Sequence, residues 1–357
     1  MLASRCILAI LGLPKCTLPV NNLLVRGIAA SATEQIKALR EKSGAPISDV
    51  KACLVEAGWD MEKAYEALRK KGLAAAAKKA SRQATEGLVG LASHPGIDNL
   101  GPKFAVVEIN SETDFVARSD LFRGLVSKVT QVALTLKGCT ASGSGVLEEL
   151  MTARTPGGET VSEACAQVAA QVRENVRLRR AFLLQGSPGS IAEGYLHMSP
   201  APGLGSIASV IILKSEPAGA LSNEVRAQAS ELVSGLAMHA AGMRPLYVDR
   251  HSVPPEVLQH ERQVLSVQAA GSGKPEAVIA KMVEGRLSKY YEDSCLLDQS
   301  YLLDDSVKVK GIIDRLSEQA GCKFSVEGMF RVQVGEGLEA AGREDFAQEV
   351  SKMMQNS

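Results

Sequence analysis

Several features are scarce in this sequence of 357 residues, and each scarcity argues against a class of function. The aromatic residues are one Trp, six Tyr and seven Phe, which leaves little surface on which bases could stack. Lys plus Arg and Asp plus Glu number 40 each, so the net charge gives no sign of a strongly basic, nucleic-acid-binding surface. No apolar run approaches the ~20 residues of a membrane-spanning helix. The absences predict a soluble protein whose partner is another protein, with no direct contact to nucleic acid or membrane.

Acidic residues are missing from the first 33 residues, and the first one is Glu34. The basic residues of this segment are Arg5, Lys15 and Arg26. A basic, acid-free leader is typical of an organellar presequence, so we expect residues 1–32 to direct the chain to the mitochondrial matrix. The alternative is a secretory signal with its apolar region at 6–13 and cleavage at 30–32. It is disfavoured because the apolar run is short and basic residues recur beyond it.

Cysteine is sparse and scattered beyond this leader. The remaining cysteines are Cys53, Cys139, Cys165, Cys295 and Cys322. An odd number without any C-x-x-C pair predicts reduced thiols rather than a disulfide framework, which favours the mitochondrion over secretion. The histidines are His94, His197, His239, His251 and His260. Neither set has the spacing of metal ligands, so we expect no metal and no cofactor.

The periodicity of apolar residues predicts an α+β protein built from several parts. Three short amphipathic stripes indicate an N-terminal three-helix module. Two later segments share the order strand, turn, strand, helix, which predicts two related α+β subdomains. An antiparallel helical hairpin is expected to interrupt the second one. The expected boundaries are 33–72 for the helical module, 73–85 for a helix-prone linker, 86–187 for the first subdomain, 188–253 with 294–357 for the second, and 254–293 for the hairpin.

Turn and cap residues predict the ends of the first three helices. The first helix should end at residues 43–44, since Pro46 prevents its continuation. Ser48 is a candidate N-cap for the second helix, which Gly58 should end. The third helix should end near Gly72.

The apparent nucleotide-binding motifs of the sequence are incomplete or misplaced, and no catalytic motif is present. "GSGK" at 271–274 lacks the earlier glycine of a phosphate-binding loop, follows a helix, and is succeeded by Pro275 instead of Ser or Thr. The run Gly203–Ala208 matches G-x-G-x-x-A but precedes a strand instead of opening a helix. No nucleophile elbow is present. We therefore expect a protein that is not an enzyme and has no small-molecule substrate.

The chain resembles the elongation factor Ts family in several segments that occur in the family's order. They include "IKALREKSGAPISDVKACLVEAGWDMEKAYEALRKKG", "INSETDFVARSDLF", "ENVRLRRA", "MHAAG", "SGKPEAVIAKMVEGRLSKYY" and "FRVQVGEG". The resemblance runs from residue 34 to about residue 350 and is most specific around T-D-F-V-A. It implies a guanine-nucleotide exchange factor that forms a heterodimer with elongation factor Tu, and a ubiquitin-associated-like fold for the helical module. With the acid-free leader, the expected partner is mitochondrial elongation factor Tu.

The resemblance also implies which residues contact this partner. Asp114 and Phe115 would reach the GTPase's nucleotide domain and disturb its magnesium and phosphate sites. The other implied contacts are Arg40, Ile47 and Ser48 of the helical module, and Ile207, Ala208 and His239 of the second subdomain.

The residues themselves leave the direction of Phe115 open. Phe115 and Phe122 are seven positions apart, so on one continuous helix both would face the core. The alternative is a loop or single turn at 113–119 with the helix starting near Ser119, because Thr, Ser and Asp compete with helix interiors through local hydrogen bonds. Together with the resemblance, this second reading predicts an outward-facing Phe115.

Three other residue patterns have plain structural interpretations. Cys53 lies on an apolar helical face and is expected in a core. His239, apart from the resemblance, is expected to be a structural histidine. Arg177, Arg179 and Arg180 alternate with apolar residues on a strand and are expected to form a solvated face with ion pairs.

Two alternative functions remain. A helical-module adaptor that binds ubiquitin would use residues 33–72 and would have no effect on a GTPase. An enzyme that uses the α+β core would need a nucleotide or metal site, which the sequence does not show.

Overall fold

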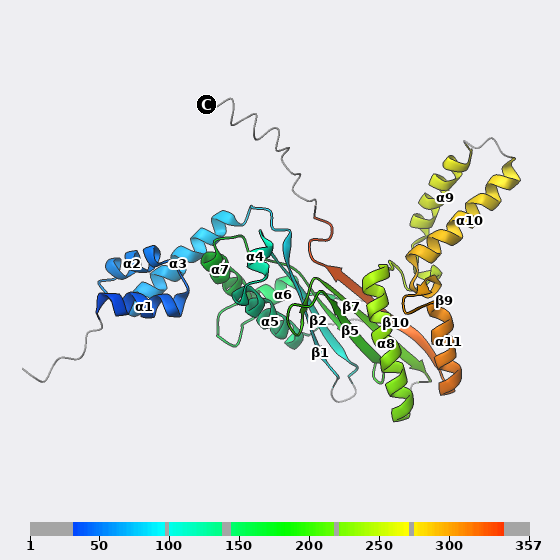
Figure 1. Ribbon diagram of the computed structural model, residues 1–357, viewed down its shortest axis with the longest axis horizontal. Coiled ribbons are helices and arrows are strands. Elements are labelled where there is room, and N and C mark those ends of the chain that lie inside the picture. Colours follow the sequence, from blue (N-terminus) through cyan, green and yellow to red (C-terminus); the bar gives the residue numbers. More distant parts are fainter. Residues whose placement is uncertain (1–30, 97–99, 138–143, 218–220, 271–274, 339–357) are drawn as a thin grey trace, which may run out of the picture. The chain divides into compact units, whose positions relative to one another are not determined.

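The computed structural model describes residues 31–96, 100–137, 144–217, 221–270 and 275–338 (Figure 1). The predicted presequence, except for its last two residues, and the "GSGK" segment lie outside the described residues. The described chain mixes helices and sheets, as the α+β prediction requires. It divides into two compact units, residues 1–67 and 68–357, each of which is described by itself.

The described residues of the first unit, from residue 31 onward, form three helices. They are α1 (Ala32–Ser43), α2 (Ile47–Glu56) and α3 (Met61–Lys79), whose C-terminal part belongs to the second unit. Ser31 and Glu34 form a capping box at the start of α1, and Gly44 ends that helix with a φ of 64°. Buried side chains of this unit include Leu39, Val50, Cys53, Leu54 and Ala64.

Two predicted helix ends were wrong. Ser48 does not cap α2, because the backbone carbonyl of Pro46 already accepts hydrogen bonds from the N–H groups of Asp49 and Val50, both at 3.0 Å. Helix α3 does not end near Gly72 but continues to Lys79 through an Ala- and Lys-rich run with high helix propensity. A Cβ at Gly72 would lie 3.0 Å from the Cβ of Ala170, so this glycine permits close packing against the helix Val161–Val172.

The second unit contains two larger antiparallel sheets and a small hairpin. The first sheet has the order β3-β4-β2-β1-β6, the second β10-β7-β5, and β8 pairs with β9. The strands are β1 (Glu86–His94), β2 (Lys103–Ser111), β3 (Ser144–Gly145), β4 (Arg177–Gln185), β5 (Ile191–His197), β6 (Leu204–Gly205), β7 (Ile207–Glu216), β8 (Ser300–Tyr301), β9 (Asp304–Lys308) and β10 (Lys323–Gln333).

Helices cover the outer face of each sheet, as Figure 1 shows. The remaining helices are α4 (Asp114–Ala117), α5 (Asp120–Thr135), α6 (Leu147–Thr152), α7 (Val161–Val172), α8 (Asn223–Met243), α9 (Pro255–Ala270), α10 (Glu276–Ser294) and α11 (Val309–Ala320), with 3-10 turns at Arg250–Ser252 and Leu296–Asp298. Helices α5, α6 and α7 pack on the first sheet, and α8 and α11 on the second. Helices α9 and α10 pack against each other as a hairpin that extends beyond the sheets.

The inner faces of the two sheets pack against each other. Side chains of β2 pack alternately against the helices and between the two sheets, because successive side chains on a strand point to opposite faces. Ala105 and Val107 face the helices, whereas Phe104 and Val106 join Val210 of β7 between the sheets. In both sheets the central strand is the one that precedes the long helix, α5 or α8. That the two halves are related stays a prediction.

Among the described residues, the layer between the two sheets contains one cluster of buried charge, and a β-bulge creates it. The register between β2 and β4 shifts so that Glu108 pairs with Arg180 and Ile109 with Leu178. Arg179 is the extra residue, and a bulge re-aims side chains locally. Both arginines therefore reach the buried carboxylate of Glu108, at 3.0 Å for Arg179 Nη1 and 2.5 Å for Arg180 Nε. The predicted ion pairs are present, but the expected solvated face was wrong for Arg179 and Arg180.

Gly90 on β1 provides a test of the packing between the first sheet and α5. A Cβ at this position would collide with Thr130 Oγ1, which is held in place by its hydrogen bond to the Val126 carbonyl. We expect Gly90→Ala to lower the free energy of unfolding by about 1–3 kcal/mol, measured by urea denaturation. Gly124→Ala on α5 is the matched control, since nothing lies within 4 Å of its added Cβ. Equal urea midpoints for the two variants would contradict this packing.

Candidate functional site

Phe115 lies on a single helical turn that connects β2 to α5. Thr113 caps this turn, α4, by accepting a hydrogen bond from Val116 N at 3.4 Å. Ser119 then caps α5 by accepting one from Phe122 N at 3.3 Å. Two successive caps break the helical path, so the two phenylalanines do not share a face. Phe115 is 80% exposed and Phe122 is fully buried, as the second reading of the sequence predicted.

Asp114 is held beside Phe115 by an ion pair. Its Oδ2 lies 2.9 Å from Arg118 Nη2, one turn further along the chain. Both side chains are substantially exposed, so the pair adds little to stability. Its effect is to orient the Asp114 carboxylate at the start of the turn. Leu121, which is 41% exposed, adds a second apolar side chain in the following turn.

The three candidates in the helical module all lie on its surface. Arg40 near the end of α1 and Ser48 in the first turn of α2 are exposed. Ile47 begins α2 and is 51% exposed, which makes it available for an apolar contact. Val55 at the other end of α2 is also exposed, a feature that the sequence reasoning missed.

Two of the candidates in the second subdomain are buried and cannot make direct side-chain contact with a partner in this conformation. Ala208 on β7 packs between the two sheets, and His239 lies on the inner side of α8. Ile207, at the start of β7, is partly exposed. Sheet packing encloses Ala208 and helix packing encloses His239, and their contacts with a partner stay a prediction. The burial of His239 agrees with its structural interpretation.

His239 holds the hairpin of β8 and β9 in place. Its Nδ1 accepts a hydrogen bond from Leu302 N at 3.1 Å, so the proton must lie on Nε2, which donates to Gln299 Oε1 at 2.9 Å. The amide nitrogen of Gln299 donates to the Asp293 carbonyl at 2.8 Å, which fixes the orientation of its oxygen. The ring also stacks on Tyr301, with centroids 6.0 Å apart. A neutral imidazole satisfies this arrangement completely.

The hairpin tip that His239 supports exposes two leucines that the sequence reasoning missed. Leu302 and Leu303 are 45% and 61% exposed, in the two-residue turn between the paired residues Tyr301 and Asp304. Two-residue hairpin turns usually contain Gly, Asn or Asp. Two leucines in such a turn are unusual, and this departure is the sequence signal that could have revealed the exposed pair. Met243, the last residue of α8, and Leu246 just beyond it are further exposed apolar residues of the same unit.

The neutral state of His239 predicts a pH dependence of stability. Burial lowers the pKa of His239 below its usual value, and the hydrogen bond with Gln299 opposes this only in part. The unfolded chain therefore binds the proton at a higher pH than the folded chain. We expect the free energy of unfolding to be largest above the ordinary histidine pKa of about 6.5 and to fall as the pH decreases below it.

His239→Gln is the matched variant, because an amide can both accept from Leu302 N and donate to Gln299 without titrating. Urea midpoints between pH 7.5 and 5.5 should fall less for this variant than for the wild-type protein. Parallel pH profiles would contradict a lowered His239 pKa.

Metal and membrane sites do not emerge from the described part of the chain. Within it, no three His, Cys, Asp or Glu side chains are grouped so that they could hold a metal ion. Among the described helices, none has the length and apolar character that a membrane span needs. Burial raises the pKa of the Cys165 thiol to about 12, so it is suited to a core and not to nucleophilic chemistry.

Comparison with known proteins identifies the family of the chain. The family model described as elongation factor TS matches residues 112–336. Elongation factor Ts, mitochondrial, from Ricinus communis is 41% identical over 325 residues, covering 87% of this chain and 83% of the relative. The mitochondrial protein of Zea mays is 39% identical over 338 residues, covering 90% and 86%. Elongation factor Ts from Rhodospirillum rubrum is 42% identical over 321 residues, covering 89% and 97%. The chain belongs to the elongation factor Ts family.

Proposed function

We propose that the chain is a non-enzymatic guanine-nucleotide exchange factor that binds mitochondrial elongation factor Tu and promotes release of its GDP. The observation that carries the proposal is Phe115, a large apolar side chain 80% exposed at the tip of a capped turn. Family membership supplies the partner. The acid-free leader and the mitochondrial relatives support a location in the mitochondrial matrix.

The proposed mechanism uses the turn at Asp114 and Phe115 as a wedge. Phe115 inserts between elements of the GTPase while Asp114 orients the turn, so that the magnesium and phosphate sites of the partner are disturbed. Burial of one phenylalanine is worth about 1.5–3 kcal/mol. Exchange requires that the factor weakens GDP binding as much as GDP weakens binding of the factor. Each tenfold of weakening corresponds to about 1.4 kcal/mol, so this ring accounts for about one to two decades.

Other surfaces supply the rest of the coupling. In the helical module, Arg40, Ile47 and Ser48 are proposed to lie against a surface helix of the GTPase. In the second subdomain, Leu302 and Leu303 at the β8–β9 tip form the apolar contact. His239 acts there through the backbone of Leu302, and Ala208 acts by packing the strand that begins at Ile207.

Complex formation tests the proposal directly. Mixed with purified mitochondrial elongation factor Tu, the chain should form a heterodimer that elutes as one species in size-exclusion chromatography. Added GDP should dissociate it in a concentration-dependent way, because linkage makes the two ligands antagonistic. A complex whose affinity is unchanged by GDP would contradict exchange activity.

The helical-module adaptor is the second candidate, favoured by the exposed Ile47 and Val55 on α2. It predicts binding to ubiquitin and no effect of the chain on GDP affinity of the GTPase. Titration of labelled ubiquitin with the chain separates the two functions.

A further inference from the structure

We propose that Glu174 is a positioning residue that presents Phe115 to the partner. This inference rests on the proposed function, in which Phe115 is the wedge. The Glu174 carboxylate accepts three hydrogen bonds from the two residues that precede the turn. They come from Glu112 N at 3.1 Å, Thr113 N at 3.0 Å and Thr113 Oγ1 at 2.7 Å.

The turn depends on the Glu174 carboxylate because helix α4 is too short to be stable through its own hydrogen bonds. Helix α4 has four residues, and a single turn is unfavourable in isolation because it fixes several dihedral angles for one hydrogen bond. The capping hydrogen bond from Val116 N to Thr113 Oγ1 is long, at 3.4 Å. Glu174 fixes the Thr113 hydroxyl in the position from which it caps, and so fixes where α4 begins.

A reciprocal contact makes the arrangement a clamp. Glu112 Oε1 accepts a hydrogen bond from Asn175 N at 2.6 Å, while Glu174 holds the backbone of Glu112. The side chain of Asn175 donates to the Arg82 carbonyl at 2.6 Å, which ties the clamp to the segment before β1. The segment after β2 and the segment before β4 therefore each bind the backbone of the other through a carboxylate.

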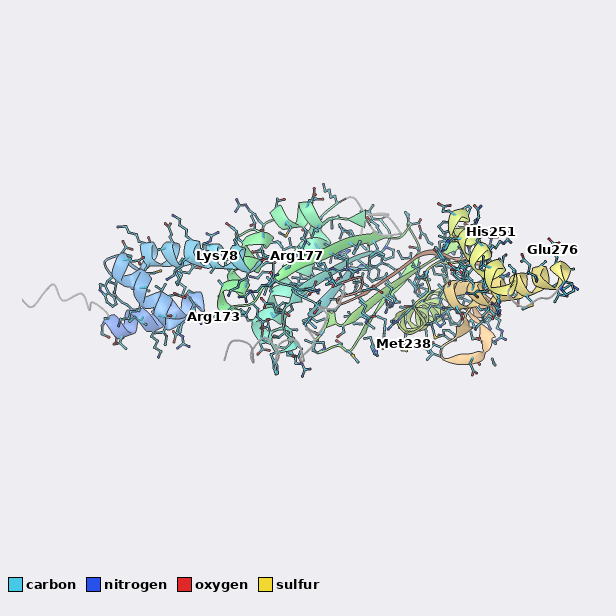
Figure 2. The ribbon with its side chains drawn as sticks, turned by 90° about the horizontal axis from the view of Figure 1, so that it is seen from above. Lys78, Arg173, Arg177, Met238, His251 and Glu276 are labelled. Carbon is cyan, nitrogen blue, oxygen red and sulfur yellow. The ribbon has the colours of Figure 1, made fainter. Side chains whose placement is uncertain are left out.

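The clamp closes the end of the β2–β4 pair. Asn110 of β2 pairs with Arg177 of β4, and the clamp residues come directly after one strand and directly before the other. Figure 2 labels Arg173 and Arg177, the two ends of the connection that carries Glu174. The direction of the Phe115 side chain is therefore set by a residue about 60 positions away in sequence.

The test is a double-mutant cycle between Glu174 and Phe115. Glu174→Ala in the full chain should reduce the stimulated rate of GDP release from elongation factor Tu roughly tenfold, since charge-assisted hydrogen bonds are lost. When Phe115 is already Ala, the same substitution should have little further effect, because its action passes through that ring. Glu174→Gln, which keeps one acceptor oxygen, should restore part of the rate.

Two controls separate positioning from loss of folding. Glu163→Ala removes the reciprocal cap of α7 and the ion pair with Arg69 at 2.6 Å, away from the turn, and should leave the stimulated rate unchanged. Hydrogen exchange of the peptide 111–118 should accelerate most in Glu174→Ala and less in Glu174→Gln. It should stay unchanged in Glu163→Ala. If Glu174→Ala does not fold, the Glu174→Gln variant and its exchange profile decide.

The possible outcomes distinguish the two claims. An unaffected rate in Phe115→Ala would overturn the wedge itself, and the positioning role with it. A reduced rate in Phe115→Ala together with a normal rate in Glu174→Ala would overturn the positioning role alone. Equal losses from Glu174→Ala in both backgrounds would also overturn it, since the effect would not pass through Phe115.

Discussion

Phe115→Ala is expected to reduce the stimulated rate of GDP release from mitochondrial elongation factor Tu by roughly ten- to a hundredfold. The ring is 80% exposed, so the isolated protein keeps its fold when the side chain is truncated. What is lost is the apolar area that the partner buries. Stopped-flow release of fluorescent GDP, with the variant and the wild-type chain at equal concentrations, measures the effect.

A matched control distinguishes this ring from other exposed apolar side chains. Met198 is 72% exposed in the connection after β5, and Met198→Ala should leave the rate unchanged. The urea midpoint of Phe115→Ala should equal that of the wild-type protein. Equal rates for the two variants, with both proteins folded, would remove the wedge role of Phe115.

Glu108→Ala is expected to lower the free energy of unfolding by about 3–5 kcal/mol. Its carboxylate is fully buried and accepts hydrogen bonds from Arg179, Arg180, Asn110 Nδ2 at 3.1 Å and Gly335 N at 2.8 Å. Its removal leaves two guanidinium groups without their common partner. The side chains of Arg179 and Arg180 are only 18% and 23% exposed, and Arg180 keeps just a 3.9 Å ion pair with Glu336, so hydration and the remaining contacts do not replace the lost carboxylate.

The cluster of Glu108, Arg179 and Arg180 joins the first sheet to the end of β10 and the segment after it. Arg180 Nη2 donates to the Gln333 carbonyl at 2.8 Å, and Arg179 Nη2 to that of Glu336 at 2.5 Å. Urea denaturation measures the expected loss. Asp314→Ala, which breaks the exposed ion pair with Lys310 on α11, is the control and should leave the midpoint almost unchanged. A loss of less than about 1 kcal/mol for Glu108→Ala would mean that the cluster is not held by its charge.

Local features of the site were predictable because they depend on neighbouring residues. Thr113 and Ser119 are capping residues that allow a break in the helix, and together with the resemblance they predicted that Phe115 leaves the helical stripe of Phe122. The mixed α+β character followed from apolar periodicity in the same way. The end of α3 was misjudged because Gly72 was read by its propensity alone, although an Ala-rich run follows it.

Features that depend on distant residues were not predictable. Glu108 meets Gly335 across 227 positions, and only the bulge in β4 brings both arginines to one carboxylate. Burial of Ala208 and His239 is decided by the second sheet and α8, so a surface role assigned by resemblance alone could not be checked in the sequence. Glu174 lies within the "ENVRLRRA" segment, but nothing local in that segment indicates that its carboxylate accepts hydrogen bonds from Thr113.

We propose that this chain accelerates nucleotide exchange on its GTPase partner. The most direct test of this proposal is the rate of fluorescent GDP release from purified mitochondrial elongation factor Tu, measured by stopped flow with and without the mature chain. We expect a release rate that rises with the concentration of the chain and saturates as the complex forms. A rate that is the same at every concentration of folded chain would contradict it.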